Sequence, residues 1–96
     1  MNELVSIIII TYNRLELLKR ALKSAEQQSY KNTEIIIVDG SSNNHTELFF
    51  KNKKKYNYIK NTNNHPNVLR NIGIESSVGN LLSFLDDDDT WEIKKI

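Results

Sequence analysis

The stretch VSIIII, from Val5 to Ile10, decides the fold of this 96-residue chain. Its apolar and mostly β-branched residues occupy both alternating sets of positions, as in a strand that is covered on both faces. A second stretch, EIIIVDG from Glu34 to Gly40, has the same character and stops at an Asp-Gly turn. Leucines at helical spacing lie between the two, so we predict a helix from about Arg14 to Gln28 and a right-handed βαβ unit.

The pattern of a capping box occurs twice, which indicates where two helices start. Asn13 is followed three positions later by Glu16, and Asn44 is followed in the same way by Glu47. We therefore predict that the side chains of Asn13 and Asn44 cap these helices. The second helix is expected from about His45 to Lys54.

The rest of the chain continues the alternation of strands and helices. A short, more exposed strand is expected from Tyr56 to Lys60, and His65-Pro66 favours the start of a helix that Gly79 ends. The stretch LLSFL, Leu81 to Leu85, is predicted to be another buried strand. This order predicts an α/β fold with an open, mostly parallel four-stranded sheet and helices on both faces, forming a single domain over residues 1–96.

Composition narrows the classes of function. Thirteen basic and 12 acidic side chains give a net charge of +1, so overall charge attracts neither nucleic acid nor an anionic membrane, and any charge-based function must lie in local clusters. The chain has no cysteine, which excludes a disulfide framework and a thiolate nucleophile. The N-terminal apolar run is too short for a membrane span and lacks the features of a signal peptide. We expect a cytoplasmic protein, with a peripheral place at the inner face of the membrane as a second location.

Three polar clusters follow predicted strands, at the edge where open α/β sheets bind ligands. They are TYNR (Thr11 to Arg14), DGSSNN (Asp39 to Asn44) and the four aspartates Asp86 to Asp89. Adjacent carboxylates repel one another unless a divalent cation or strong hydrogen bonding offsets the repulsion, and hard oxygen ligands suit Mg²⁺ or Mn²⁺. The alternative is a solvated acidic loop that precedes a helix.

Single side chains in these clusters each have two interpretations. The Asp39 carboxylate accepts hydrogen bonds from a base or ribose, or it belongs to an ordinary Asp-Gly turn. Tyr12 stacks on a base, or it packs at the rim of the fold. Arg14 and Arg70 bind phosphate or carboxylate, or they are surface charges in the first turn of a helix. A run of lysines is interpreted as a solvated helix face and does not favour nucleic-acid binding: Lys51, Lys53, Lys54 and Lys55.

Taken together, the motifs resemble a known family. The strings VSIIIITYNR, IIIVDGSSNNHT and VLRNIGIESSVGNLLSFLDDDDTW are similar, in order and separation, to the nucleotide-sugar-binding half of family 2 glycosyltransferases, which have the glycosyltransferase A fold. The resemblance runs from about Val5 to Trp91. It implies transfer of a sugar, with inversion, from a nucleotide-sugar donor, commonly a UDP-sugar, to a glycan or lipid-linked acceptor in cell-surface polysaccharide biosynthesis.

The resemblance also assigns nucleotide-binding roles. Thr11 and Tyr12 match residues that line the nucleotide base. Asp39 matches the aspartate that hydrogen-bonds the base, commonly uracil, and Arg70 matches an arginine near the base and diphosphate. Arg14 joins them as a candidate ligand of phosphate.

The aspartate run matches the DxD motif of the family, which contacts ribose and holds a metal ion. Asp86 and Asp88 match its outer positions, and Asp87 stands in its variable place as a further nucleotide-binding candidate. The resemblance thus implies Mn²⁺ or Mg²⁺ as cofactor, with Asp88 and Asp86 as ligands. A cation there would stabilise the charge that develops on the leaving diphosphate.

The chain departs from the family pattern at three points. The first is Ile10, which stands where the family usually has proline. Gly40 stands where many members have a second aspartate, which is an accepted variant. The chain stops at Ile96, before the segment that in the family carries the acceptor site and the general base, so we expect a domain truncated after the DxD motif, without a catalytic residue and inactive alone. We also expect apolar surface from Trp91 to Ile96 and self-association through it.

Two other classes of function stay open at this point. A non-catalytic nucleotide-binding or partner-binding domain would keep the sheet without the transfer reaction. A sugar-nucleotide-forming nucleotidyltransferase would share the sheet but require a glycine-rich loop after the first strand, and TYNRLELL, Thr11 to Leu18, contains no glycine.

Overall fold

The computed structural model describes residues 3–61, 65–93 and 95–96 of the chain. In this part of the chain the strands are β1 (Val5–Thr11), β2 (Thr33–Asp39), β3 (Asn57–Lys60) and β4 (Leu81–Phe84), and the helices are α1 (Leu15–Glu26), α2 (His45–Phe50) and α3 (Pro66–Ser76). All strand pairs are parallel, and the strand order is β3-β2-β1-β4. The predicted fold class, an open parallel sheet in an α/β fold, is confirmed.

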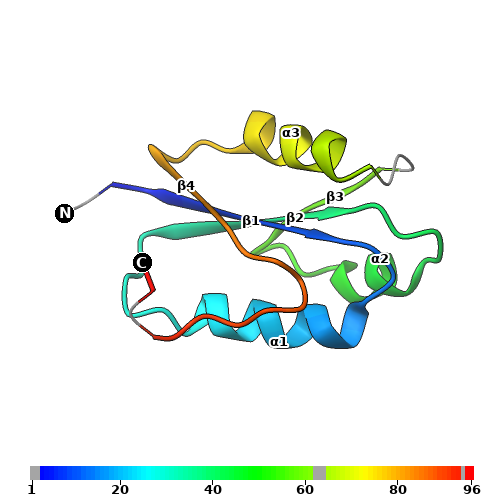
Figure 1. Ribbon diagram of the computed structural model, residues 1–96, viewed down its shortest axis with the longest axis horizontal. Coiled ribbons are helices and arrows are strands. Elements are labelled where there is room, and N and C mark those ends of the chain that lie inside the picture. The colour runs from blue at the N-terminus through cyan, green and yellow to red at the C-terminus, as the bar shows by residue number, and fades with distance from the viewer. Residues whose placement is uncertain (1–2, 62–64, 94) are drawn as a thin grey trace.

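Helices cover both faces of the sheet and enclose two apolar cores. Figure 1 shows α1 and α2 on one side of the sheet and α3 on the other. The larger core, on the α1 side, includes Val5, Ile7, Ile9, Leu18, Leu22, Ile35, Ile37 and Phe50. The smaller core, beneath α3, consists of Ile8, Ile36, Val38 and Leu69. Successive residues of β1 and β2 point to opposite cores, which explains why both stretches are apolar at nearly every position.

The capping box predicted for α1 is wrong. Helix α1 begins after Arg14, whose side chain makes no capping hydrogen bond. Asn13 has a left-handed backbone, with φ of 54°, and its side-chain amide exchanges two hydrogen bonds with Ser42. The Asn13 side chain therefore joins the loops that follow β1 and β2, and this interaction replaces the predicted cap.

The prediction for α2 is confirmed for its first residue, His45, but is wrong for its cap and for its end. Asn44 precedes the helix, as expected, but its side chain makes no capping hydrogen bond. The helix ends at Phe50 and does not reach Lys54. Asn52 takes the left-handed conformation, with φ of 71°, which turns the chain out of the helix before the lysines.

Helix α3 begins as predicted but ends earlier. Pro66 is its first residue, and His65 caps it by accepting a hydrogen bond from the backbone of the next turn. The helix ends at Ser76, so Gly79 does not terminate it. A Cβ atom on Gly79 would lie 2.5 Å from Ser6 Oγ, and glycine is required here because the loop passes directly against β1.

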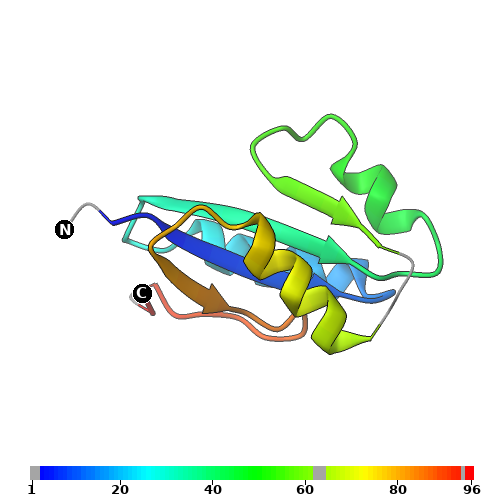
Figure 2. The ribbon, with the colours of Figure 1, turned by 90° about the horizontal axis from the view of Figure 1, so that it is seen from above.

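The prediction that LLSFL is buried is wrong except for its last residue. Leu81, Leu82 and Phe84 are between 42% and 47% exposed, whereas Leu85 is buried. Strand β4 pairs only with β1 and lies at one edge of the sheet, with β3 at the other edge (Figure 2). The apolar residues of β4 are therefore exposed because, in the described residues, no further strand pairs with its outer side.

The segment after the aspartates runs back along α1 (Figure 1). Trp91 packs against the larger core, and its backbone N–H donates to Ser24 Oγ at 3.0 Å. The buried Gln28 donates to the carbonyl of Glu92 at 2.6 Å. The expectation of exposed apolar surface from Trp91 to Ile96 is therefore wrong for Trp91, which packs on the core. Ile93, in the same segment, is 62% exposed.

Helices of the described ranges are all too short or too polar to cross a lipid bilayer.

Candidate functional site

A row of polar side chains crosses the carboxyl edge of the sheet. The strand registers place Thr11 beside Asp39 and Asp39 beside Lys60, so the three side chains project from the same face. Asp87, which follows β4, joins the row because it accepts a hydrogen bond from Thr11 Oγ1 at 2.9 Å. We call these four residues the terminal polar row. Parallel strand pairing brings its members together although they are far apart in the sequence.

One half of the terminal polar row contains the buried member of the aspartate run. Asp87 is 7% exposed and is held by Thr11 and by Arg14 Nη1, 3.3 Å from its Oδ1. The same Arg14 nitrogen lies 3.5 Å from Oδ2 of Asp88, whose side chain is 55% exposed. Arg14 thus contacts two consecutive aspartates and offsets part of the repulsion within the run. Because Arg14 and Asp88 are exposed, the second contact contributes little to stability.

The other half is a network around Asp39, which is completely buried. Asp39 Oδ1 accepts a hydrogen bond from the backbone N–H of Ser41 at 2.8 Å, and Oδ2 accepts one from the Tyr58 hydroxyl at 2.5 Å. Lys60 Nζ lies 3.7 Å from the same Oδ2 and donates to the carbonyl of Asn43 at 2.8 Å. Burial and the hydrogen bond to Asp39 raise the pKa of Tyr58, so its hydroxyl remains a donor at neutral pH. The network fixes the loop that follows β2.

A hollow of about 160 Å³ opens between the end of β1 and the start of α3. Its polar wall consists of Thr11, Arg14 and Asp87, and Tyr12, 40% exposed, stands at its rim. Its apolar wall consists of Ile10, Pro66 and Leu69. An apolar surface with an aromatic ring and hydrogen-bonding groups beside it suits a nucleobase or ribose. Larger hollows elsewhere, of about 360 and 450 Å³, contain none of the predicted site residues.

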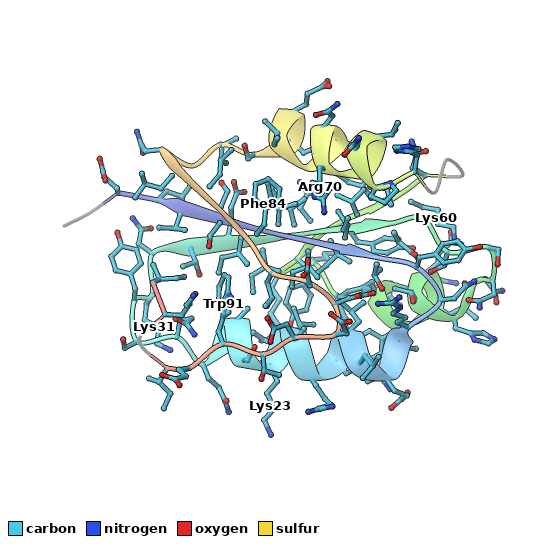
Figure 3. The ribbon with its side chains drawn as sticks, in the orientation of Figure 1. Lys23, Lys31, Lys60, Arg70, Phe84 and Trp91 are labelled. Atoms are coloured by element: carbon cyan, nitrogen blue, oxygen red, sulfur yellow. The ribbon has the colours of Figure 1, made fainter. Side chains whose placement is uncertain are left out.

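Four predicted site residues do not line this hollow: Asp39, Arg70, Asp86 and Asp88. Asp39 is buried in its own network, with both carboxylate oxygens hydrogen-bonded inside the protein. Arg70 is exposed on α3, and its Nη1 donates to Asn67 Oδ1 at 3.4 Å. Figure 3 shows Arg70 on the α3 side of the sheet, together with Phe84. Asp86 is exposed at the end of β4. The structure therefore gathers part of the predicted site: Thr11, Tyr12, Arg14 and Asp87, with Asp88 beside them.

The carboxylates of the aspartate run do not form a closed metal site by themselves. Among residues 3–61, 65–93 and 95–96, no three carboxylates or imidazoles converge on a common point. Asp86 and Asp88 are exposed carboxylates at the edge of the sheet, whereas Asp87 is held by Thr11 and Arg14. Hard oxygen donors fit Mg²⁺ or Mn²⁺, and such an ion takes its remaining ligands from phosphate and water. The arrangement suits an ion shared with a bound diphosphate, and it does not form a complete cage.

Sequence reasoning missed two residues of the Asp39 network. Tyr58 and Lys60 stand two positions apart in a predicted strand, so their shared face was readable from the sequence. Their place beside Asp39 required the register of β2 and β3, which no local pattern specifies.

These features define the class of protein: an α/β domain whose candidate site lies at the carboxyl ends of parallel strands. The family described as Glycosyl transferase family 2 matches residues 6–96, and the chain belongs to this family. Its predicted resemblance to the family is thereby confirmed.

Two curated relatives carry specific activities. The chain is 36% identical over 91 residues to the GalNAc(5)-diNAcBac-PP-undecaprenol β-1,3-glucosyltransferase of Campylobacter jejuni, covering 88% of this chain and 29% of that protein. It is 39% identical over 97 residues to the UDP-Glc:α-D-GlcNAc-diphosphoundecaprenol β-1,3-glucosyltransferase WfaP of Escherichia coli, covering 98% of this chain and 39% of WfaP. The chain therefore spans well under half the length of these relatives.

Solved structures include a similar domain with a bound nucleotide. The structure of Staphylococcus aureus TarS, residues 1–349 in complex with UDP, matches with a TM-score of 0.80 and 25% identity, covering 94% of this chain and 29% of that chain. This likeness agrees with the glycosyltransferase A fold expected from the sequence.

Proposed function

We propose that this chain is the donor-binding part of an inverting, metal-dependent glycosyltransferase that uses a UDP-sugar. The observation that carries the proposal is the meeting of the TYNR motif and the aspartate run at one hollow, through Thr11, Arg14 and Asp87. The UDP bound to the similar TarS domain supports uracil as the base. The hollow accommodates part of a nucleotide, and the diphosphate would extend toward the exposed aspartates.

Charge at the site matches the chemistry of sugar transfer. The leaving diphosphate gains negative charge as the bond to the sugar breaks, and preorganised cations lower the barrier to this step. Arg14 supplies a fixed positive charge beside Asp87 and Asp88. We propose Asp88 and Asp86 as the residues that hold Mn²⁺ or Mg²⁺, which when bound supplies Lewis-acid stabilisation of the diphosphate.

We expect the chain alone to bind donor without transferring sugar. An acceptor hydroxyl must lose its proton to a general base close to the anomeric carbon. The buried carboxylate at the hollow, Asp87, accepts hydrogen bonds from Thr11 and Arg14, which occupy its oxygens. Asp87 is thus a positioning group, and none of the predicted residues takes the role of base.

The acceptor proposed for the whole protein is a lipid-linked glycan. Both curated relatives described above are named for acceptors attached to undecaprenol through a diphosphate. We extend this class of acceptor to the protein to which the chain belongs, together with a role in polysaccharide biosynthesis. A lipid-linked acceptor places the reaction at a membrane surface, and a cytoplasmic supply of UDP-sugar places it at the inner face.

We propose that the chain self-associates through β4. This surface replaces the Trp91 region expected from the sequence, because Trp91 packs against the core. Leu81, Leu82 and Phe84 lie on an edge strand and are each more than 40% exposed. An open apolar edge pairs readily with another strand, and two copies can extend their sheets in this way.

Calorimetric titration with UDP tests the proposed function. We expect binding in the presence of Mn²⁺, and a loss of at least tenfold in affinity on chelation or in Asp88→Asn, because the metal screens the diphosphate from the aspartates. Glu75→Gln removes an exposed carboxylate of α3 and is the matched control, with unchanged affinity. Equal UDP affinity with and without chelator would contradict the metal role, and the absence of UDP binding would contradict the donor site.

A further inference from the structure

A lysine-rich segment connects α2 to β3. Residues 48–60 contain five lysines and no acidic residue, although the whole chain has 13 basic and 12 acidic side chains. The net charge of +1 therefore conceals a strong local concentration of positive charge. We call residues 51–55 the lysine loop.

Most of the positive charge in the lysine loop is uncompensated. Lys51, Lys53 and Lys54 are exposed, and in the part of the chain that the structure describes none of them forms an ion pair with a carboxylate. Lys53 lies over the ring of Phe49, 4.3 Å from its centroid. Lys55, in contrast, is paired, with Nζ 3.0 Å from Glu26 Oε2. The loop thus presents ammonium groups that a diffuse anionic surface can attract.

The position of the loop makes it accessible to a flat surface. Figure 2 shows the connection from α2 to β3 projecting beyond the β3 edge of the sheet, on the side opposite to β4. Leu48, 58% exposed, lines the same surface hollow as Lys51, so an apolar side chain accompanies the charges. Glu47 also lines this hollow and is the acidic group nearest in sequence to the loop.

The aromatic rings near the loop face inward. Phe50 stacks on Tyr58 with centroids 5.3 Å apart and meets Tyr56 edge-on at 5.5 Å. Single-stranded nucleic acid is bound by basic grooves in which free aromatic rings stack on bases. Here the rings pack against one another and are not free to stack on bases, so the geometry does not suit nucleic acid.

We propose that the lysine loop docks the protein on an anionic phospholipid surface, with Leu48 entering the interface. A lysine held beside an anionic leaflet strengthens binding by about fivefold, and the attraction weakens as salt screens it. Docking at the β3 edge leaves the hollow at the carboxyl edge open to donor. The inference rests on the proposed function for the choice of a membrane as partner, because a lipid-linked acceptor is found there.

Vesicle co-sedimentation of the 96-residue chain tests the inference. The probes are vesicles of phosphatidylglycerol mixed with phosphatidylcholine, and vesicles of phosphatidylcholine alone. The double variant K51Q/K54Q should bind the anionic vesicles about 25-fold more weakly. The matched control R20Q/K95Q removes the same charge from exposed positions outside the loop and should stay within about twofold of the parent. Glu47→Gln should strengthen binding.

Several outcomes would overturn the inference. They are equal binding to both kinds of vesicle, an equal loss of binding in the two double variants, and tighter binding to a single-stranded oligonucleotide than to anionic vesicles. Titration with UDP in the absence of vesicles reports separately on the proposed function, so failure of donor binding and failure of membrane docking are distinguishable.

Discussion

The hydroxyl of Tyr58 donates a hydrogen bond to Asp39 at 2.5 Å, joining the edge strand β3 to a carboxylate that has no exposed surface. Asp39 is the residue that the family resemblance assigns to the nucleotide base. In this structure its two oxygens accept hydrogen bonds from the backbone N–H of Ser41 and from the phenol of Tyr58. On this geometry Asp39 holds the loop after β2, and its carboxylate has no exposed surface to offer a base.

Tyr58→Phe should destabilise the fold. The substitution keeps the ring that stacks on Phe50 but leaves a buried oxygen of Asp39 without its hydroxyl donor, which costs about 1–3 kcal/mol. Urea denaturation measures the difference in free energy of unfolding. Tyr12→Phe is the control, since Tyr12 is at the exposed rim and its change should alter stability by less than about 0.5 kcal/mol. Equal stability of Tyr58→Phe and the parent would contradict the role of the hydrogen bond.

Stability should also depend on pH through Tyr58 in alkaline solution. Burial and Asp39 raise the pKa of Tyr58 above its ordinary value of 10.0, so the folded state keeps a proton that the unfolded chain releases. The stabilisation is fully present below pH 10 and is lost as the pH rises toward the folded-state pKa. Thermal melts of the parent and of Tyr58→Phe across this range check the sign. The parent should lose more stability than the variant, and parallel curves would rule out the linkage.

Thr11→Val should weaken the organisation of the donor site. Valine keeps the shape of threonine but removes the hydroxyl that donates to Asp87 at 2.9 Å, so we expect a loss of about 1–2 kcal/mol in stability and weaker UDP binding. Thr46→Val provides a matched control. Thr46 is equally buried, but its Oγ1 has no hydrogen-bond partner among the described residues, so the change should be neutral or stabilising. The same cost in both variants would show that the Asp87 contact is unimportant.

Gly73→Ala tests the contact of α3 with the sheet. An exposed Gly→Ala change in a helix normally stabilises by about 1 kcal/mol. At Gly73, however, a Cβ would lie 2.5 Å from Ile8 Cγ2, so α3 must move and we expect a net destabilisation of about 1–3 kcal/mol. Asn71→Ala, at an exposed position of the same helix, should instead be neutral or slightly stabilising. Guanidinium unfolding of the two variants should give changes of opposite sign, and a stabilised Gly73→Ala would show that no close contact exists.

Removing apolar surface from β4 should reduce self-association. The double variant L82S/F84S replaces two side chains that are 42% and 45% exposed, so it removes apolar surface from the edge of the sheet, with a cost in folding stability because each side chain is also partly buried. Sedimentation velocity at rising concentration measures the effect. Leu48→Ser, which removes an exposed apolar residue on α2, should leave association unchanged. Monomeric behaviour of the unsubstituted chain at high concentration would contradict the proposal.

Most of the helices and strands could be predicted because their signals are local. The β-branched runs of β1 and β2, the proline that begins α3 and the alternation of elements are all readable within short windows. The errors occur where a distant partner decides the outcome. Asn13 bonds to Ser42 on another loop and therefore does not cap α1, and Gly79 serves the approach to Ser6 and does not end a helix.

Part of the candidate site could be predicted for the same reason. Thr11, Arg14 and Asp87 lie in motifs at strand ends, and parallel pairing brings those ends to one edge. Arg70 and Asp86 belong to similar motifs but do not line the hollow. No motif indicates that Asp87, and not its neighbours, is the buried member of the run, because burial depends on how the loop after β4 folds onto β1.

By itself the sequence determined the fold class, the order of the elements and the edge that carries the candidate site, since apolar periodicity and chain direction specify these locally. Tertiary structure alone decided that Asp39 is enclosed by Tyr58 and Lys60, that β4 exposes its apolar residues, and that the lysine loop projects from the sheet. These features depend on strand register and on which elements pack together. Such contacts join residues far apart in the chain, and their energies become visible only when the chain is folded.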